Sequence, residues 1–286
     1  SIMYEVLFIL FQYVVPKKLI SKMIGVLARS EIVFIKNTFI KTFQMMYDVN
    51  MQEARNEDGL SYPSFNSFFV RSLKPECRPI DKNINSVISP VDGSVSQLGN
   101  VKSGKLIQAK GMYFNLLEFL GNNKPIYEKM KEGLFSTFYL SPKDYHRVHM
   151  PLDGKLREMI YLPGKLFSVN STTSKRVKNL YSKNERLVCI FDTVRGPMVV
   201  VLVGAMIVSG ITVNWEDEDI FNKGKIQKLM YPTIGKGSVS LKKGDEVGRF
   251  MLGSTVVVCF GMNKIHWEDE ISIGSVIKMG QSVGYF

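Results

Sequence analysis

The stretch from Leu187 to Gly204, LVCIFDTVRGPMVVVLVG, consists of two apolar runs on either side of Arg195-Gly196-Pro197. Valine, isoleucine and phenylalanine dominate both runs, and such residues favour extended chain. Glycine and proline between two runs of this kind indicate a hairpin turn. We therefore expect a pair of antiparallel strands here, with apolar character continuing to Val213.

The same sequence pattern extends from about Pro75 to the end of the chain, where short β-branched or aromatic runs alternate with glycine. Helices are scarce in this part, and Phe114 to Leu120 is the best candidate. Further strands are expected within Ser86–Leu98, Leu134–Leu140, Leu156–Leu162, Phe250–Phe260 and Ser275–Lys278. The sequence thus predicts an α+β protein in which residues 75–286 form a predominantly antiparallel β domain.

Residues 1–74 have a different character. The run from Ile2 to Val15 is largely apolar, but it is shorter than the roughly 20 residues that a membrane-spanning helix needs. Lysines then alternate with aliphatic and aromatic residues after Pro16 and again in Ile32–Tyr47, which predicts two basic amphipathic helices. Such helices either pack on the rest of the protein or lie on a lipid surface. Two of them behind an apolar leader favour membrane association.

The formal net charge is +11, from 37 basic and 26 acidic residues, so the chain should be attracted to polyanions. Nucleic acid is not expected, because no binding motif of the usual kinds is present. An anionic membrane surface is the expected partner. The three cysteines lie far apart, which indicates neither a disulfide framework nor a zinc site. Because the first residue is Ser1, we expect a fragment or a processed form.

Two of the three histidines lie in the segment YHRVHMP, residues 145–151. Their spacing of three would put both on one face of a helix, as in many metal sites, but Val148 and Pro151 favour extended chain. We therefore expect no metal site. Taken singly, His146 and His149 are more often structural residues than catalysts.

Two other segments carry side chains that are able to do chemistry. Asp92 lies in Ser89–Gly93, SPVDG, where the ordinary interpretation is a turn residue bonded to its own backbone. Ser254 lies in LGST, residues 252–255, directly before the run VVVCF. By itself this small dipeptide indicates no more than the start of a strand.

The whole chain, however, resembles the bacterial and mitochondrial type of phosphatidylserine decarboxylase. The strongest signatures are YHRVHMP and LGST. The resemblance is carried by these segments: Tyr13–Leu19, Phe65–Arg71 (FNSFFVR), Arg78–Asp81 (RPID), Pro90–Gly99, Gln108–Gly111, Tyr139–Pro151, Leu156–Val169, Asn184–Arg186, Phe191–Thr193, Gly204–Ile211 and Gly248–Thr255. Phosphatidylserine is the substrate that this resemblance implies, and phosphatidylethanolamine and CO2 are the products.

The resemblance also implies that Asp92, His149 and Ser254 act together to cut the chain between Gly253 and Ser254. A serine hydroxyl is a weak nucleophile, so it needs a base, and the base needs a partner that fixes its tautomer. His149 and Asp92 suit these two roles. His146 is implied as the acid that returns a proton to the substrate after CO2 has left.

Ser254 would attack the carbonyl carbon of Gly253 to form an ester, and elimination and loss of ammonia would then convert Ser254 into a pyruvoyl group. This covalent cofactor would form a Schiff base with the lipid amine and accept the electrons of the breaking bond. Two chains would result, a β subunit that ends at residue 253 and an α subunit of residues 254–286. No other cofactor is expected.

We expect the two cleaved chains to stay together, and we also expect a homodimer. The membrane concerned, whether mitochondrial, endoplasmic or bacterial, is not distinguished by the residues. Two alternatives stay open. One is an uncleaved serine hydrolase that uses Ser254, His149 and Asp92, although it would lack the G-x-S-x-G motif. The other is a noncatalytic membrane-binding module.

Overall fold

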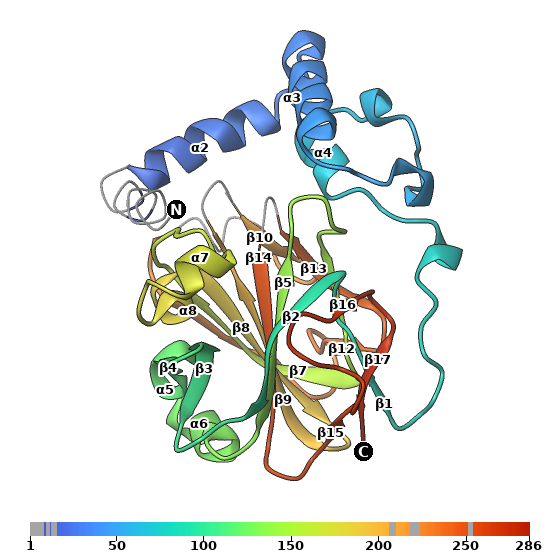
Figure 1. Cartoon of the computed structure of the whole chain (residues 1–286). Helices are drawn as coiled ribbons and strands as arrows, with labels where there is room; N and C mark the ends of the chain where they lie inside the picture. The colour runs from blue at the N-terminus through green and yellow to red at the C-terminus, as the bar shows by residue number, and fades with distance from the viewer. Residues whose placement is uncertain (1–8, 10–11, 13–15, 206–209, 218–223, 251–253) are drawn as a thin grey trace.

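The computed structural model describes residues 9, 12, 16–205, 210–217, 224–250 and 254–286. Its centre is a nine-stranded antiparallel sheet (Figure 1). In spatial order the strands are β11 (Gln227–Met230), β7 (Gly154–Leu162), β8 (Arg186–Thr193), β9 (Gly196–Val203), β14 (Ser254–Phe260), β5 (Leu134–Leu140), β2 (Gly93–Asn100) and β16 (Val276–Ile277), and β12 (Ser240–Leu241) also pairs with β7. The predicted α+β class with mostly antiparallel strands is confirmed.

The hairpin predicted from the opening stretch is formed by β8 and β9. Thr193 pairs with Gly196, so the turn consists of Val194 and Arg195, one residue earlier than expected. Gly196 has φ +87°, a value that favours glycine, and this explains why glycine follows the turn.

Both faces of the sheet are buried, which explains why its strands are continuous apolar runs. In β14, Val256 and Val258 belong to a hydrophobic cluster on one face, while Val257 and Cys259 belong to a second cluster on the other face. The alternation follows the two-residue period of a strand.

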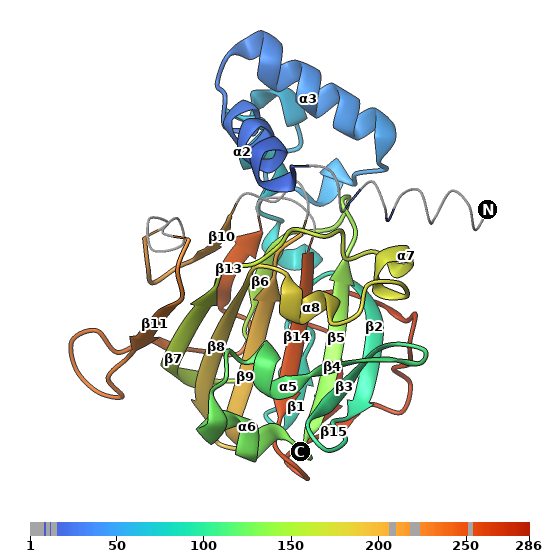
Figure 2. The ribbon, with the colours of Figure 1, turned by 90° about the vertical axis from the view of Figure 1, so that its left-hand side faces the viewer.

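Different elements cover the two faces (Figure 2). Two small sheets contribute to the first cluster: β10 (Ile211–Val213), β13 (Glu246–Phe250) and β6 (Arg147–His149) form one, and β1 (Ser86–Ile88), β17 (Ser282–Tyr285) and β15 (His266–Trp267) form the other. The second face is covered by short elements: α5 (Leu116–Phe119), α6 (Lys124–Met130), α8 (Leu180–Lys183) and the hairpin of β3 (Lys105–Ala109) and β4 (Met112–Asn115), with α7 (Ser171–Ser174) beside them. Helix α5 lies where a helix was predicted.

The two predicted N-terminal helices are present as α2 (Lys17–Ala28) and α3 (Val33–Met46). Four short helical elements follow: η1 (Met51–Glu53), η2 (Gly59–Ser61), α4 (Phe65–Phe69) and η3 (Pro75–Cys77). Helices α2, α3 and α4 lie beyond one end of the large sheet (Figure 1) and share a third hydrophobic cluster, drawn from residues 28–70. In the described ranges, no helix has both the length and the apolar character needed to cross a membrane.

Candidate functional site

Three strands meet at the end of the sheet that lies nearest the N-terminal helices. At the end of β5, Tyr139 pairs with Ser94 of β2 on one side and with Thr255 of β14 on the other. The next residue of β5, Leu140, pairs with Ser254. Because neighbouring strands lie about 4.8 Å apart, the backbones of Ser254 and the start of β2 are separated by roughly 10 Å.

Asp92 immediately precedes β2 and is placed at this end of the sheet by Gly93. Gly93 has φ +148°, and a Cβ atom there would lie 2.1 Å from the carbonyl oxygen of Tyr139. Glycine alone allows the chain to approach β5 so closely. The Asp92-Gly93 dipeptide therefore turns the chain and also brings it into close contact with β5.

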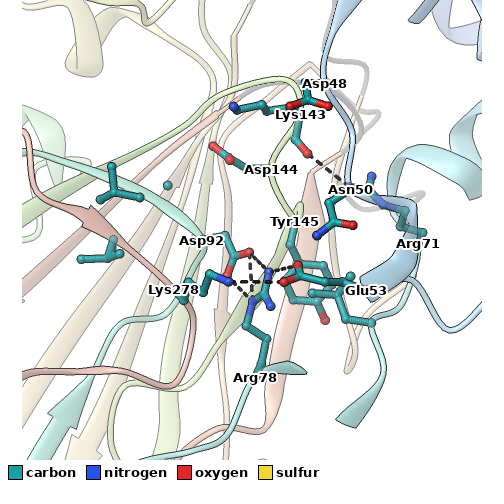
Figure 3. Close-up of a pocket in the computed structure, with 14 residues that line it drawn as sticks. Asp48, Asn50, Glu53, Arg71, Arg78, Asp92, Lys143, Asp144, Tyr145 and Lys278 are labelled. Atoms are coloured by element: carbon teal, nitrogen blue, oxygen red, sulfur yellow. Dashed lines mark hydrogen bonds and ion pairs between the residues drawn. The ribbon is translucent and has the colours of Figure 1, made fainter. Parts of the chain in front are cut away.

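The Asp92 carboxylate is buried and held by an arginine (Figure 3). It accepts hydrogen bonds of 2.8 and 3.0 Å from Nε of Arg78, a further contact from Nη2, and one of 2.9 Å from the backbone N–H of Met279. Arg78 Nη2 also donates to Glu53 at 2.7 Å. Burial by itself would lower the pKa of Arg78, but the hydrogen bonds to Asp92 and Glu53 outweigh it and raise the pKa. Arg78 is thus a permanent cation.

His149 is held by two partners from other elements. Its Nδ1 lies 2.7 Å from the carbonyl oxygen of Gly244, and its Nε2 lies 3.0 Å from the hydroxyl of Tyr145. A carbonyl oxygen only accepts, so Nδ1 carries the proton and Nε2 accepts from Tyr145. Burial lowers the pKa of His149, while the hydrogen bond to Gly244 and, more weakly, the charges of Glu246 and Asp92 act in the opposite direction. The imidazole is therefore a neutral base at neutral pH.

His146 is fully buried and lies on the ring of Phe69, with 4.1 Å between the ring centroids. Its Nε2 lies 3.0 Å from the carbonyl oxygen of Ser141 and 3.2 Å from that of Pro142, so it donates. In the part of the chain that the structure describes, Nδ1 has no hydrogen-bond partner. Burial lowers the pKa of His146 to about 3, which leaves a neutral ring with a free lone pair.

The expected cleavage segment is anchored on one side by the connection that follows β5 and on the other by the last residue of β5. The backbone N–H of Phe250, at the end of β13, donates to the carbonyl oxygen of His146 at 3.1 Å. On the other side Ser254 pairs with Leu140. Gly253 and the side chain of Ser254 lie outside the described residues.

A cavity of about 260 Å³ opens beside Asp92 (Figure 3). It lies between the segment after α3 and the loop after β5. Charged side chains dominate its lining: Asp48, Glu53, Arg71, Arg78, Asp92, Lys143, Asp144 and Lys278. Burial raises the pKa of Asp144, although Ser141 donates two hydrogen bonds to its carboxylate. The cavity thus offers charges of both signs to a polar headgroup.

The structure brings Asp92, His149 and the backbone of Ser254 to one end of the sheet. The backbone N–H of His149 donates to the carbonyl oxygen of Pro90 at 2.8 Å, which ties β6 to the segment before Asp92. Among the interactions of the described residues, however, Asp92 and His149 share no hydrogen bond. Gly244, rather than Asp92, fixes the tautomer of the imidazole.

Arg78, Tyr145 and Arg71 are not distinguished as functional residues by the sequence alone. Each lies within a segment that carries the resemblance, in RPID, YHRVHMP and FNSFFVR respectively. Their position in these segments was the signal that could have identified them. Their roles depend on contacts with residues distant in the chain.

Comparisons with known proteins show which family the chain is similar to. The family model described as "Phosphatidylserine decarboxylase" matches residues 65–285, and a second, described as "PSD", matches residues 7–48. The phosphatidylserine decarboxylase proenzyme of Pseudomonas fluorescens strain Pf-5 is 47% identical over 278 residues, which cover 97% of this chain and 96% of that protein. The proenzyme of Ectopseudomonas mendocina strain ymp is 48% identical over 278 residues, with 97% of each chain covered.

Proposed function

The chain belongs to the phosphatidylserine decarboxylase family, and on this premise we propose how its residues divide the work of the reaction. It is a carboxy-lyase that converts phosphatidylserine to phosphatidylethanolamine and CO2. It is made as a proenzyme that cuts itself, and it uses a covalently bound pyruvoyl group.

Ser254 is the residue that becomes the pyruvoyl group in this proposal. Its backbone stands at the first position of β14, and the pairing of Thr255 to Phe260 with β5 and β9 would persist if a new chain began there. Nδ1 of His146, a buried nitrogen without a hydrogen-bond partner among the described residues, lies in the connection that follows Leu140, the residue of β5 with which Ser254 pairs. These features fit the group, which when bound supplies an electron acceptor that no ordinary side chain offers.

Cleavage begins when the hydroxyl oxygen of Ser254 attacks the carbonyl carbon of Gly253 and the peptide nitrogen leaves, giving an ester. Nε2 of His149 takes the hydroxyl proton, because Nδ1 is already the donor to Gly244. Nε2 must first release the hydroxyl of Tyr145. The charges of Glu246 and Asp92 then stabilise the imidazolium through space, while Arg78 holds the Asp92 carboxylate in place.

Transfer of the α-proton of Ser254 to a base then breaks the ester bond and releases Gly253 as a carboxylate, and water displaces the nitrogen of the resulting dehydroalanine as ammonia to leave the ketone. During turnover His146 returns a proton to the carbon from which CO2 has left. A histidine with so low a pKa is rarely protonated, but its protonated form is a strong acid. Its free Nδ1 is the atom that carries this proton.

Helices α2 and α3 dock on the membrane in this proposal. On α2, the large apolar side chains of Leu19, Met23 and Val26 are 58%, 58% and 59% exposed, and Phe34 at the start of α3 is 80% exposed. The buried face of α2 carries small residues: Ser21, Gly25 and Ala28. This is the reverse of an ordinary surface helix, and a lipid surface would cover the exposed apolar face.

Residues 1–74 would thus be the membrane-association region, and residues 75–286 the catalytic domain. Lys36, which the sequence placed among the lysines of the lipid-facing helix, is 9% exposed and donates to the carbonyl oxygens of Leu60 and Tyr62 at 2.6 and 2.9 Å. Lys36 therefore forms hydrogen bonds within the helical region. The homodimer stays a prediction.

The convergence of β2, β14 and the loop after β5 at one end of the sheet is the observation that carries this function. The intact mass of the purified protein tests it. Wild-type protein should give two chains, the smaller starting with a pyruvoyl group, and should release CO2 from phosphatidylserine. Ser254→Ala should stay as one chain, whereas Ser136→Ala, at a buried serine of β5, should be cut normally.

An active, uncut wild-type chain would overturn the assignment and would favour the serine hydrolase if it released fatty acid. A chain that bound liposomes without releasing CO2 would favour the noncatalytic module.

A further inference from the structure

Arg71, two residues after α4, is a buried cation that pairs with no carboxylate among the described residues. It is 4% exposed, and Nη2 donates to the carbonyl oxygen of Lys143 at 3.2 Å. In the part of the chain that is described, Nε and Nη1 have no hydrogen-bond partner, and no carboxylate forms an ion pair with the guanidinium. Burial lowers its pKa. An unpaired buried charge is costly, so its retention calls for an explanation.

Two other buried arginines show which partners a structural arginine ordinarily has. Arg186 is 5% exposed, yet each of its guanidinium nitrogens donates to a backbone carbonyl. Arg78 is 8% exposed and pairs with Asp92 and Glu53. Arg71 has a single carbonyl and the ring of Phe68, 5.7 Å away.

The guanidinium lines the charged cavity beside Asp92 (Figure 3). The other charges of this cavity are largely committed: Arg78 and Lys278 pair with Glu53, and Asp144 accepts from Ser141. Arg71 acts electrostatically on His146, which places it near the candidate acid. The cavity is smaller than the 300–1,000 Å³ typical of sites for drug-sized ligands, which suits a headgroup without its acyl chains.

We propose that Arg71 binds the phosphodiester group of the lipid headgroup and holds the substrate in the cavity through a charge that survives the reaction. This inference rests on the proposed function. The planar fork of donors on a guanidinium matches phosphate oxygens, and a second cation, Lys143, stands at the rim of the same cavity.

The serine headgroup also carries a carboxylate, but that group is a poor partner for Arg71. Its negative charge moves into the electron acceptor as CO2 departs, so a guanidinium on it would stabilise the substrate more than the transition state. The phosphodiester keeps its charge throughout. Anchoring it leaves the carboxylate free to lose its charge.

Soluble headgroup analogues test this assignment as inhibitors of CO2 release from phosphatidylserine in detergent micelles. Glycerophosphoserine carries both anions, glycerophosphoethanolamine only the phosphodiester, and O-methylserine only the carboxylate. In Arg71→Gln the inhibition constants of the two phosphodiesters should rise by a similar factor, about 10- to 100-fold, because a charge-assisted bidentate contact is lost. The constant of O-methylserine should change less than about threefold, within the scatter of such contacts. Arg71→Lys, which keeps the charge but not the fork, should give an intermediate loss for the phosphodiesters.

Arg157→Gln is the matched control, since it removes an arginine charge that Asp192 pairs with outside this cavity. It should leave all three constants near the wild-type values. A rise confined to glycerophosphoserine and O-methylserine would assign Arg71 to the carboxylate, and unchanged constants would show that Arg71 does not bind the headgroup. Either result overturns the inference. A wild-type protein that released no CO2 would instead refute the proposed function.

Discussion

The carbonyl oxygen of Gly244 accepts a hydrogen bond from Nδ1 of His149 at 2.7 Å. Gly244 has φ +89°, and a Cβ atom there would lie 2.9 Å from Cδ1 of Ile80. The turn can present its carbonyl to the imidazole only with glycine at this position. The tautomer of the proposed base is therefore set by a backbone group that is 95 residues away in the sequence.

Gly244→Ala should slow self-cleavage by displacing this carbonyl. Gly235→Ala is the control, because Gly235 has φ +85° but no atom within 4 Å of its hypothetical Cβ. Both changes should lower the free energy of unfolding by about 1 kcal/mol, since both force alanine into a left-handed conformation. Only Gly244→Ala should delay the appearance of two bands on a denaturing gel. Equal cleavage rates would show that the carbonyl does not orient His149.

Tyr145→Phe should shift the pH profile of self-cleavage to higher pH. The Tyr145 hydroxyl donates to Nε2 and so stabilises the neutral imidazole, whose pKa is already lowered by burial. Without this bond the pKa of His149 rises, by up to about one unit for a hydrogen bond of about 1 kcal/mol. Cleavage needs the neutral base. As the pH is lowered, the cleavage rate of the variant should therefore begin to fall at a higher pH than the rate of the wild type. An unshifted profile would argue against His149 as the base.

Asp92→Asn should block cleavage and also destabilise the protein. The change removes one of the two carboxylates that hold buried Arg78, which should cost about 2 kcal/mol in the free energy of unfolding. Glu53→Gln removes the other carboxylate and should cost less, because Glu53 is more exposed. If the charge of Asp92 assists His149, the Glu53 variant will still be cut. Failure of both would indicate that Arg78 must be held firmly and that the charge of Asp92 has no separate role.

Met23→Gln and Phe34→Gln should weaken binding to anionic vesicles, by several-fold each, because each removes exposed apolar surface from the proposed docking face. Val194→Gln changes an equally exposed side chain in the β8–β9 turn, at the opposite end of the sheet, and should have no effect. Vesicle flotation measures all three. Added salt should weaken the wild-type binding further, since it screens the lysines. Equal binding by all variants would remove the helices from this role.

Much of the fold could be predicted because its signals are local. The β8–β9 hairpin and β14 are apolar runs between turn residues, and α2 and α3 carry a helical period. The face on which each residue lies was not predictable, since both faces of the sheet are buried and both demand apolar side chains.

The segments SPVDG, YHRVHMP and LGST predicted the candidate catalytic residues, whose roles stay a prediction, and the family membership is confirmed. The sequence did not show which groups contact these residues. A lysine at position 36 looks like a headgroup ligand in sequence, and it turns inward because two carbonyl oxygens of the following loop lie within reach.

The sequence by itself determined the strand-rich class, the two leading helices and the family to which the chain belongs, since each depends on residues close together in the chain. Only the tertiary structure decided that Arg78 holds Asp92, that Gly244 orients His149 and that Arg71 is buried with no carboxylate partner in the described part of the chain. Charges and hydrogen bonds act over a few ångströms in space, and the residues concerned lie up to 95 positions apart. Their pairing exists only once the sheet has brought those segments together.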